Sequence, residues 1–221
     1  MAAANYDEMT LDEVRLALGE ALPADAAFDG WTAQAVAATC ARVGLDPKIG
    51  ALAFSEGAIA MIDAWFASID SAMISACPTE ALATRKIRER ITHLVETRMA
   101  LTAPHREALR RAQAILANPL NARHALRLGW RTADAIWRQA GDTATDYNHY
   151  TKRAILGSVY AATMLVFVND ESDDQADTKA FLARRIEGVM QFEKLKARLT
   201  SPSAVGFSPA RLLGRLRYPA R

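Results

Sequence analysis

Three side chains on one predicted helix have the types and the spacing of a metal site. Glu89, His93 and Glu96 are four and three residues apart, which places them on one helix face. Glutamates and histidines on facing helices can hold a di-iron centre, but that chemistry requires a Glu-x-x-His motif from each of two helices. No Glu-x-x-His occurs in the sequence. We therefore predict no metal site.

The acidic run NDESDDQAD, at 169–177, is a second candidate. An EF-hand loop that starts at Asp170 needs glycine at its sixth position and glutamate at its twelfth, and Gln175 and Phe181 stand there instead. We interpret the run as acidic residues at a helix N-terminus, where the helix dipole favours negative charge. The sequence also lacks the GxSxG, Walker A and GxGxxG motifs, so it does not indicate an enzyme.

The segment WRTADAIWRQAGDTATDYNHYTKRA, at 130–154, combines aromatic rings with charges. Trp130, Asp134 and Trp137 stand at i, i+4 and i+7, so they share one helix face. Tryptophan beside aspartate and arginine is typical of the central residues of an interface. In the alternative interpretation, Trp137 is a core ring and Asp134 pairs with Arg138 one turn later.

The composition is that of an ordinary soluble protein. The chain has 221 residues, of which 51% are hydrophobic and 24% charged, and a net charge of +2 that gives no indication of nucleic acid binding. Cys40 and Cys77 lie far apart among apolar residues, which predicts two small buried thiols. The N-terminus lacks the basic and apolar regions of a secretory signal, so we expect a cytoplasmic protein.

Hydrophobic spacing predicts eight or nine helices and no strand. The first covers 10–21, capped by Thr10 and stopped near Pro23. The second covers 33–43 between Thr32 and Gly44, and a short third begins at Asp46-Pro47, which is helix-turn-helix spacing. A charged helix is predicted over 79–99, and a last long helix over 176–199.

The helix predicted over 145–168 contains the uncharged segment AILGSVYAATMLVFV. At about 1.5 Å per residue the segment is about 22 Å long, and it is shorter than the roughly 20 residues that a bilayer span requires. A helix that is apolar on every side lies in a core, in a subunit interface or along an apolar cavity. The spacing leaves all three explanations open.

The long pattern WR…AGD…TDYNHYTKRA, with LATRKIRERI before it and DTKAFLARRIEGVMQFEKLKARL after it, resembles the ubiquinone (coenzyme Q) biosynthesis protein nine family. The resemblance covers about 30–199 and implies an all-α, TetR-like fold. We expect a helix-turn-helix-like part over 1–54, a helical lipid-binding and dimerisation part over 55–199, and a basic tail over 200–221 that is partly amphipathic or disordered.

The resemblance also implies a function. The protein is expected to be a non-enzymatic homodimer without a cofactor, at the cytoplasmic face of the inner membrane. It would bind isoprenoid quinone intermediates or phospholipid in an apolar pocket and present them to a di-iron hydroxylase of the ubiquinone pathway. In relatives, the aspartate and tryptophan before AGD contact that hydroxylase, and these are Asp134 and Trp137 here.

Three sets of site residues follow. The expected partner-binding surface consists of Trp130, Asp134, Trp137, Tyr147 and Tyr150. The apolar helix faces predict a lipid lining of Phe54, Ile62, Trp65, Phe66, Ile69, Ile155, Val159, Ala162, Leu165 and Val166. In the tail, one apolar and one basic side predict a membrane contact through Arg211, Leu212, Leu213, Arg215, Leu216 and Arg217.

Two other functions are compatible with such a fold. A TetR-type DNA-binding regulator would need phosphate contacts from basic residues, but the candidate recognition segment DPKIGALAFSEG has Lys48 as its only base. A structural assembly factor without a lipid ligand is the other alternative.

Overall fold

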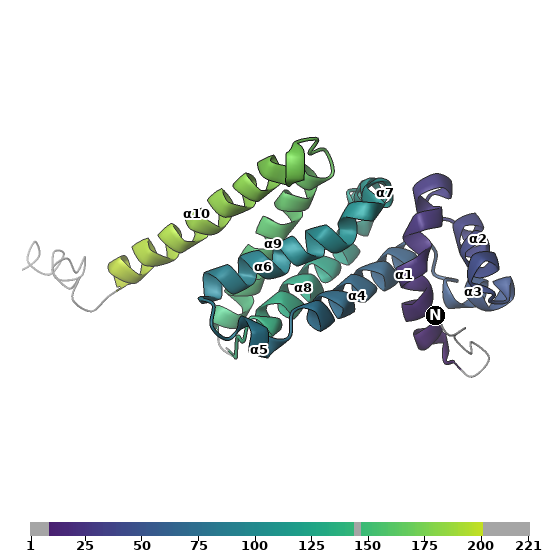
Figure 1. The fold of residues 1–221 in the computed structure, drawn as a ribbon, viewed down its shortest axis with the longest axis horizontal. Helices are drawn as coiled ribbons and strands as arrows, with labels where there is room; N and C mark the ends of the chain where they lie inside the picture. Colours follow the sequence, from purple (N-terminus) through teal and green to yellow (C-terminus); the bar gives the residue numbers. More distant parts are fainter. Residues whose placement is uncertain (1–8, 144–146, 201–221) are drawn as a thin grey trace, which may run out of the picture. The chain divides into compact units, whose positions relative to one another are not determined.

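The structure is a computed structural model that describes the fold of residues 9–143 and 147–200 (Figure 1). Every regular element in these ranges is a helix, which confirms the predicted all-α fold. The α-helices are α1 (Leu11–Asp29), α2 (Ala33–Val43), α3 (Pro47–Ala53), α4 (Ala58–Ala76), α5 (Thr79–Leu82), α6 (Ile87–Thr102), α7 (Arg106–Leu116), α8 (Ala122–Gln139), α9 (Tyr147–Phe167) and α10 (Ala176–Thr200). Short 3-10 turns precede α7, α8 and α10.

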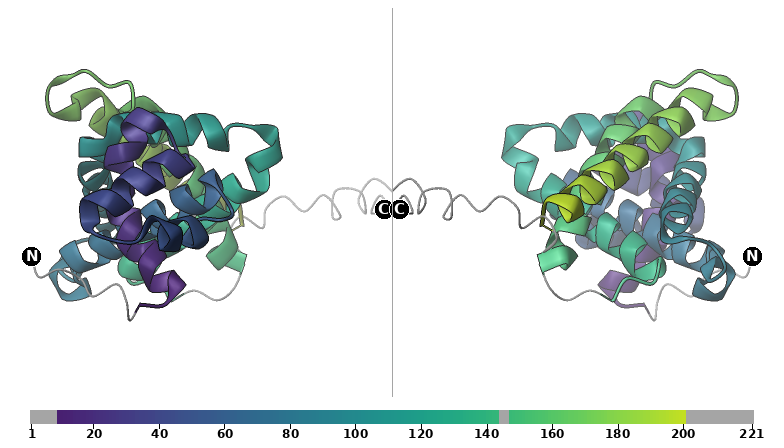
Figure 2. Two further views of the ribbon diagram at one scale, coloured as in Figure 1. Left: turned by 90° about the vertical axis from the view of Figure 1, so that its right-hand side faces the viewer. Right: turned by 90° about the vertical axis from the view of Figure 1, so that its left-hand side faces the viewer.

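The helix caps at Thr10, Thr32 and Gly44 are those that the sequence predicts. Thr10 forms a capping box with Glu13, and the Thr32 side chain accepts from the backbone N–H of Ala35. Gly44 ends α2 in the left-handed conformation, with φ of 79°. These ends fix the turn between α2 and α3, and α1, α2 and α3 pack together as one group (Figure 2).

Two predicted helix ends are wrong. The first helix does not stop near Pro23 but continues through it to Asp29. Proline in a helix interior costs about 3 kcal/mol, but the helix buries Leu18, Leu22 and Ala26 on either side of it, and each large apolar side chain contributes a comparable amount. The charged helix predicted over 79–99 is two helices, because Arg90 donates to the carbonyl oxygens of Ala83 and Arg85 and so holds the chain in a break between α5 and α6.

Helix α4 is central to the packing, since it contacts α1, α6, α7 and α8. A Cβ atom added at Gly19 of α1 would lie 2.6 Å from the carbonyl oxygen of Ala64, so glycine permits the close crossing of α1 and α4. By length and composition α4 could span a membrane, with a mean hydropathy of 1.3. It buries Ile62, Trp65 and Met73 in the protein, and we interpret it as a core helix.

Helices α8 and α9 form a closely packed antiparallel pair. Gly157 of α9 faces the backbone of Gly129 in α8, with room for contact at ordinary van der Waals distance. Within this chain the uncharged segment of α9 is not buried on every side, since Leu165 is 58% exposed, and a subunit interface or an apolar cavity therefore stay open as explanations. The chain divides into two compact units, Met1–Leu182 and Ala183–Arg221, and the sites below all lie in the first.

Candidate functional site

An apolar cavity of about 250 Å³ lies between α4, α7, α8 and α9. Phe66 contributes from α4, and α7 contributes Leu109 and Leu116. The wall also contains Gln113, Ala117, Ala125, Leu128, Gly129, Thr132, Gly157, Tyr160, Ala161, Met164 and Leu165. The cavity therefore exists where four helices meet, and the two glycines of the α8–α9 contact form part of its wall.

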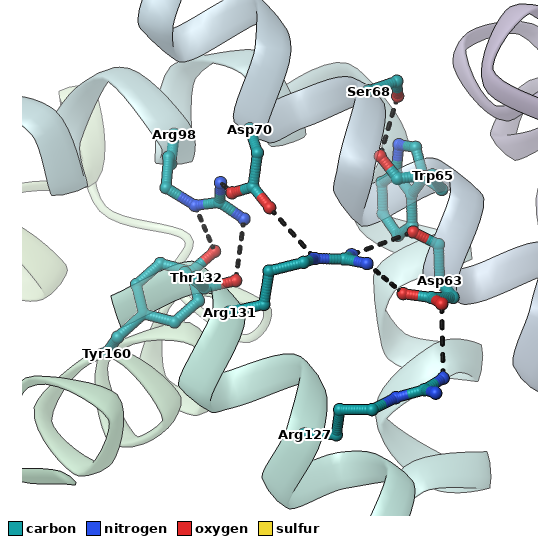
Figure 3. A network of polar contacts seen from close by, with 9 residues as sticks. All are labelled: Asp63, Trp65, Ser68, Asp70, Arg98, Arg127, Arg131, Thr132 and Tyr160. Carbon is teal, nitrogen blue, oxygen red and sulfur yellow. Dashed lines mark hydrogen bonds and ion pairs between the residues drawn. The ribbon is translucent and has the colours of Figure 1, made fainter. Parts of the chain in front are cut away.

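A buried polar network supports one part of this wall. Arg98 of α6 is fully buried, and its guanidinium donates from Nε to the hydroxyl of Tyr160 at 3.2 Å and from Nη2 to Thr132 Oγ1 at 3.4 Å (Figure 3). Its Nη1 pairs with the carboxylate of Asp70, which neutralises the buried charge. The two hydroxyls are thus held in place by a group outside the cavity.

The network continues towards the surface through Arg131. Its Nε lies 3.3 Å from Asp70 Oδ2, without the geometry of a hydrogen bond, and its Nη2 donates to the carbonyl oxygen of Asp63 at 3.0 Å. Arg127 pairs with the Asp63 carboxylate at 3.3 Å (Figure 3). Asp63 and Asp70, seven residues apart on α4, therefore fasten this helix to α8.

The residues that were predicted to line one lipid site are distributed between two separate hollows, or lie in neither. Phe66 and Leu165 lie in the wall of the cavity. Trp65 and Ile69 lie on another side of α4, in a second hollow of about 560 Å³ between α4 and α1. The other predicted lining residues are absent from the described walls of both spaces, and they are Phe54, Ile62, Ile155, Val159, Ala162 and Val166.

Sequence reasoning missed the contributions of α7 and α8 to the cavity. Leu109, Leu116, Leu128 and Thr132 were not among the expected lining residues, although both helices have a clear apolar stripe. That stripe indicates a buried face, but it does not indicate whether protein atoms or a ligand cover it.

The second hollow has a different chemical character. The rings of Trp65 and Trp31 are tilted against each other with their centroids 5.3 Å apart, and the Trp65 ring meets the His105 ring edge-on with the centroids 6.5 Å apart. Burial lowers the pKa of His105, because the apolar surroundings disfavour its charged form. Glu13 and Glu20 of α1 complete an acidic rim.

Two of the five predicted partner-binding residues form an exposed aromatic cluster. Trp130 is 38% exposed and lies 6.0 Å from the ring of Tyr150, which is 60% exposed. His149 lies 6.4 Å from Trp130 and 5.1 Å from Tyr150, so the three rings from α8 and α9 make one surface. His149 was not predicted as part of it.

Asp134 and Trp137 are instead engaged between α8 and α9. Asp134 accepts from the buried Arg153 at 2.6 Å and pairs with Arg138 at 2.8 Å. Trp137 is half-buried, and its indole N–H donates to the carbonyl oxygen of Lys152 at 3.1 Å. The Asp134–Arg138 pair of the alternative interpretation is thus present, although Trp137 is only half-buried, and the partner contact of Asp134 and Trp137 stays a prediction.

The remaining predicted residues lie outside the described side chains. They are Tyr147 of the partner-binding surface and the membrane set of Arg211, Leu212, Leu213, Arg215, Leu216 and Arg217.

The arrangement of helices is that of the TetR class of proteins. The structure matches the crystal structure of a TetR transcriptional regulator from Nitrosomonas europaea with a TM-score of 0.62, over 79% of this chain and 97% of that one. The two sequences are 23% identical, so the likeness concerns the fold alone. It confirms the predicted TetR-like fold.

Within that class, the sequence identifies the relatives. Residues 122–193 match the COQ9 family. The chain is 33% identical over 169 residues to rat mitochondrial ubiquinone biosynthesis protein COQ9, covering 73% of this chain and 54% of the rat protein. The human protein is 30% identical over 176 residues, and the match covers 73% of this chain and 52% of the human protein. The Xenopus tropicalis protein is 40% identical over 96 residues, and the match covers 43% of this chain and 30% of that protein. The chain is therefore a relative of the COQ9 proteins, as its sequence predicted, and it spans about half the length of the mammalian relatives.

Proposed function

We propose that the protein is a non-enzymatic accessory protein of ubiquinone biosynthesis. It binds isoprenoid quinone intermediates or phospholipid in the cavity between α4, α7, α8 and α9. It presents them to a di-iron hydroxylase of the pathway, as a homodimer at the cytoplasmic face of the inner membrane. The rat and human relatives are mitochondrial ubiquinone biosynthesis proteins, which supports the pathway.

The observation that carries the lipid-binding role is the apolar cavity beside the polar network. Ligand pockets are apolar spaces with a few placed polar groups, and they fall at or above about 300 Å³. A cavity of about 250 Å³ is slightly smaller than this, so it has room for a ring or a short chain segment rather than a whole lipid. The exposed Leu165 and Ala161 at its rim offer apolar surface to the remainder of the ligand.

The exposed ring cluster supports the partner role. Aromatic side chains are enriched among the residues that contribute most to protein interfaces. Trp130 directly follows the wall residue Gly129 on α8, and Tyr150 lies about two helical turns before the wall residue Gly157 on α9. A partner bound to these rings would therefore touch helices that also enclose the ligand.

The alternative of a DNA-binding regulator is weakly supported by the side chains of α2 and α3. Arg42, which precedes the candidate recognition segment, is paired with Asp25 at 2.6 Å and donates to the carbonyl oxygen of Ala21, so its charge is compensated within the protein. Lys48 is the only base of the candidate recognition segment, and one phosphate contact supplies little affinity.

Extraction of the purified protein with organic solvent, followed by mass spectrometry, tests the lipid-binding role. We expect an isoprenoid quinone, one of its precursors or a phospholipid in near-stoichiometric amount. Protein that contains none of these, and that binds none when they are supplied, would favour the assembly factor without a ligand. A tight, salt-sensitive and sequence-selective shift of DNA in a gel would favour the regulator.

A further inference from the structure

The hollow between α1 and α4 is separate from the apolar cavity, and the proposed lipid-binding role does not use it. One wall is formed by Glu13, Leu16, Ala17 and Glu20 of α1, which lie on one helix face because they are three or four residues apart. Trp65 and Ile69 of α4 lie in the opposite wall. At about 560 Å³ the hollow has the usual size of a small-molecule site.

The α1 wall carries two carboxylates that no base of the described chain neutralises. Glu13 accepts hydrogen bonds from the backbone N–H and the hydroxyl of Thr10. Glu20 is exposed and forms no ion pair or hydrogen bond with a residue that the structure describes. Arg15, on the same helix, pairs with Asp12 instead.

The remaining wall does not compensate this negative charge. Among the described residues that line the hollow there is no lysine and no arginine. Burial lowers the pKa of His105, so its ring adds no positive charge at neutral pH. The whole chain has a net charge of +2, so the acidic character is a local property of this hollow and not of the protein surface in general.

The spacing of the two carboxylates limits what can bind between them. Glu20 follows Glu13 by seven residues, which is about 10 Å along the helix axis at about 1.5 Å per residue, so one small cation cannot contact both. Leu16, which is 47% exposed, and Ala17 lie between them on the same face. The wall therefore presents an acid, an apolar stretch and a second acid in a row.

A complementary ligand has a positive charge at each end and an apolar middle. An anion would meet two carboxylates without a base, and an uncharged chain would leave both carboxylates without a partner. A chain with one ammonium group would pair with only one of them.

We propose that this hollow binds a linear diammonium ion of the class of the diaminoalkanes and polyamines. One ammonium group pairs with Glu13 and the other with Glu20. The methylene groups between them pack on Leu16 and Ala17, and Ile69 faces them from α4.

Four soluble probes test the proposal by calorimetry with the full chain. Octamethylenediamine has an extended length close to two helical turns. Putrescine has the same two charges on a shorter chain, octylamine has one charge, and octamethylene glycol has none. The NMR signal of the Trp65 indole N–H reports whether a probe binds in the hollow, because this ring lies in its wall.

The variants remove one charge or part of the space. Glu13→Gln and Glu20→Gln keep the shape of each side chain, and glutamine at position 13 also supports a capping box with Thr10. Glu56→Gln is the matched control, because Glu56 is exposed and lies outside the described wall. Ala72→Leu adds volume inside the hollow.

We expect octamethylenediamine to bind about fivefold or more tightly than each of the other three probes, and to shift the Trp65 signal. Glu13→Gln and Glu20→Gln should each weaken it about fivefold, as the loss of one exposed ion pair would, and so bring it to the level of octylamine. Ala72→Leu should weaken its binding as well, and Glu56→Gln should not.

Equal affinity for putrescine, or an equal loss in Glu56→Gln, would mean that cations are attracted to the surface without a built site. Equal affinity for octamethylene glycol would mean an apolar groove for uncharged chains, and a Trp65 signal that does not move would place the binding elsewhere. Each result overturns the proposal and leaves the lipid-binding role untouched. Should Glu13→Gln disturb the fold, Glu20→Gln alone decides, because its side chain contacts no described partner.

Discussion

At the scale of single residues, the ion pairs between α8 and α9 change what can be expected of Asp134. Its carboxylate was predicted to face a partner protein, but it also compensates Arg153, which is 2% exposed. Asp142 is the other carboxylate of this pair system, at 3.1 Å from the same guanidinium. A side chain with this structural role cannot be removed without an effect on folding.

We predict that Asp134→Asn lowers the free energy of unfolding by about 1–3 kcal/mol, because it leaves a buried guanidinium with one carboxylate fewer. Arg138→Ala is the matched control. It removes the exposed partner of the same carboxylate and should change the stability by less than about 1 kcal/mol. Urea unfolding followed by circular dichroism measures both, and equal stabilities would show that Asp134 is not needed by Arg153.

The exposed rings are better residues for testing partner binding. We predict that Trp130→Ala combined with Tyr150→Ala weakens binding to the pathway hydroxylase at least tenfold, since central aromatic contacts contribute about 2 kcal/mol or more each. The unfolding midpoint should change little, because both side chains are exposed. Leu120→Ala removes another exposed apolar side chain and serves as the control. An unaltered affinity of the double variant in surface plasmon resonance would place the partner surface elsewhere.

At the scale of elements, the loop between α9 and α10 is held in place by the carboxylate of Asp170. Asp170 accepts from the backbone N–H and the hydroxyl of both Ser172 and Thr178, and these hydrogen bonds hold the pKa of its carboxyl well below the ordinary value. Arg106 and Arg110 of α7 donate to the carbonyl oxygens of Asp170 and Val168 at the end of α9. The loop is therefore fixed from both sides.

The depressed pKa of Asp170 predicts a pH dependence of stability. The folded carboxyl has a lower pKa than the unfolded one, which is near 3.9, so its contribution is complete above about pH 4 and is lost as the pH falls below that value. Asp170→Asn should therefore be less stable than the unaltered protein at neutral pH, and the difference should shrink in acid. Thermal unfolding at several pH values measures it, and a difference that is independent of pH would contradict the role of the charge.

The crossing of α1 and α4 gives a further prediction. Gly19→Ala would push a methyl group against the backbone of Ala64, and we expect a loss of about 1–3 kcal/mol in the free energy of unfolding. Gly129→Ala, at a position where an added Cβ meets no atom within 4 Å, should instead be neutral or stabilise by up to about 1 kcal/mol through helix propensity. Equal effects in chemical denaturation would mean that α1 and α4 separate at little cost.

At the scale of the whole molecule, α4 connects the group formed by α1, α2 and α3 to the proposed lipid site. One side of α4 packs on α1, and Phe66 reaches the cavity.

A ligand that binds only the folded state stabilises it by about 2.7 kcal/mol when the free ligand concentration is a hundred times the dissociation constant. We predict that decylubiquinone raises the unfolding temperature of lipid-free protein in a concentration-dependent way, as measured by scanning calorimetry. Ala125→Leu, at a wall position of α8, should reduce the rise by filling part of the cavity, whereas Gly188→Ala, which lies outside the cavity wall, should not. The predicted homodimer and the three predicted domain ranges stay predictions.

The sequence by itself determined the helical class, the caps at Thr10, Thr32 and Gly44, the buried cysteines and the family resemblance, because caps, periodicity and long motifs are local properties of the chain. Tertiary structure alone decided that Pro23 lies inside a helix, that Trp65 and Phe66 serve different hollows, and that α7 and α8 line the cavity. It also decided that Arg98 contacts Asp70, Thr132 and Tyr160 through polar interactions, although Tyr160 lies 62 residues away in the sequence. The physical reason is that an apolar stripe specifies burial but not the partner that buries it, and a polar network across four helices depends on how those helices pack.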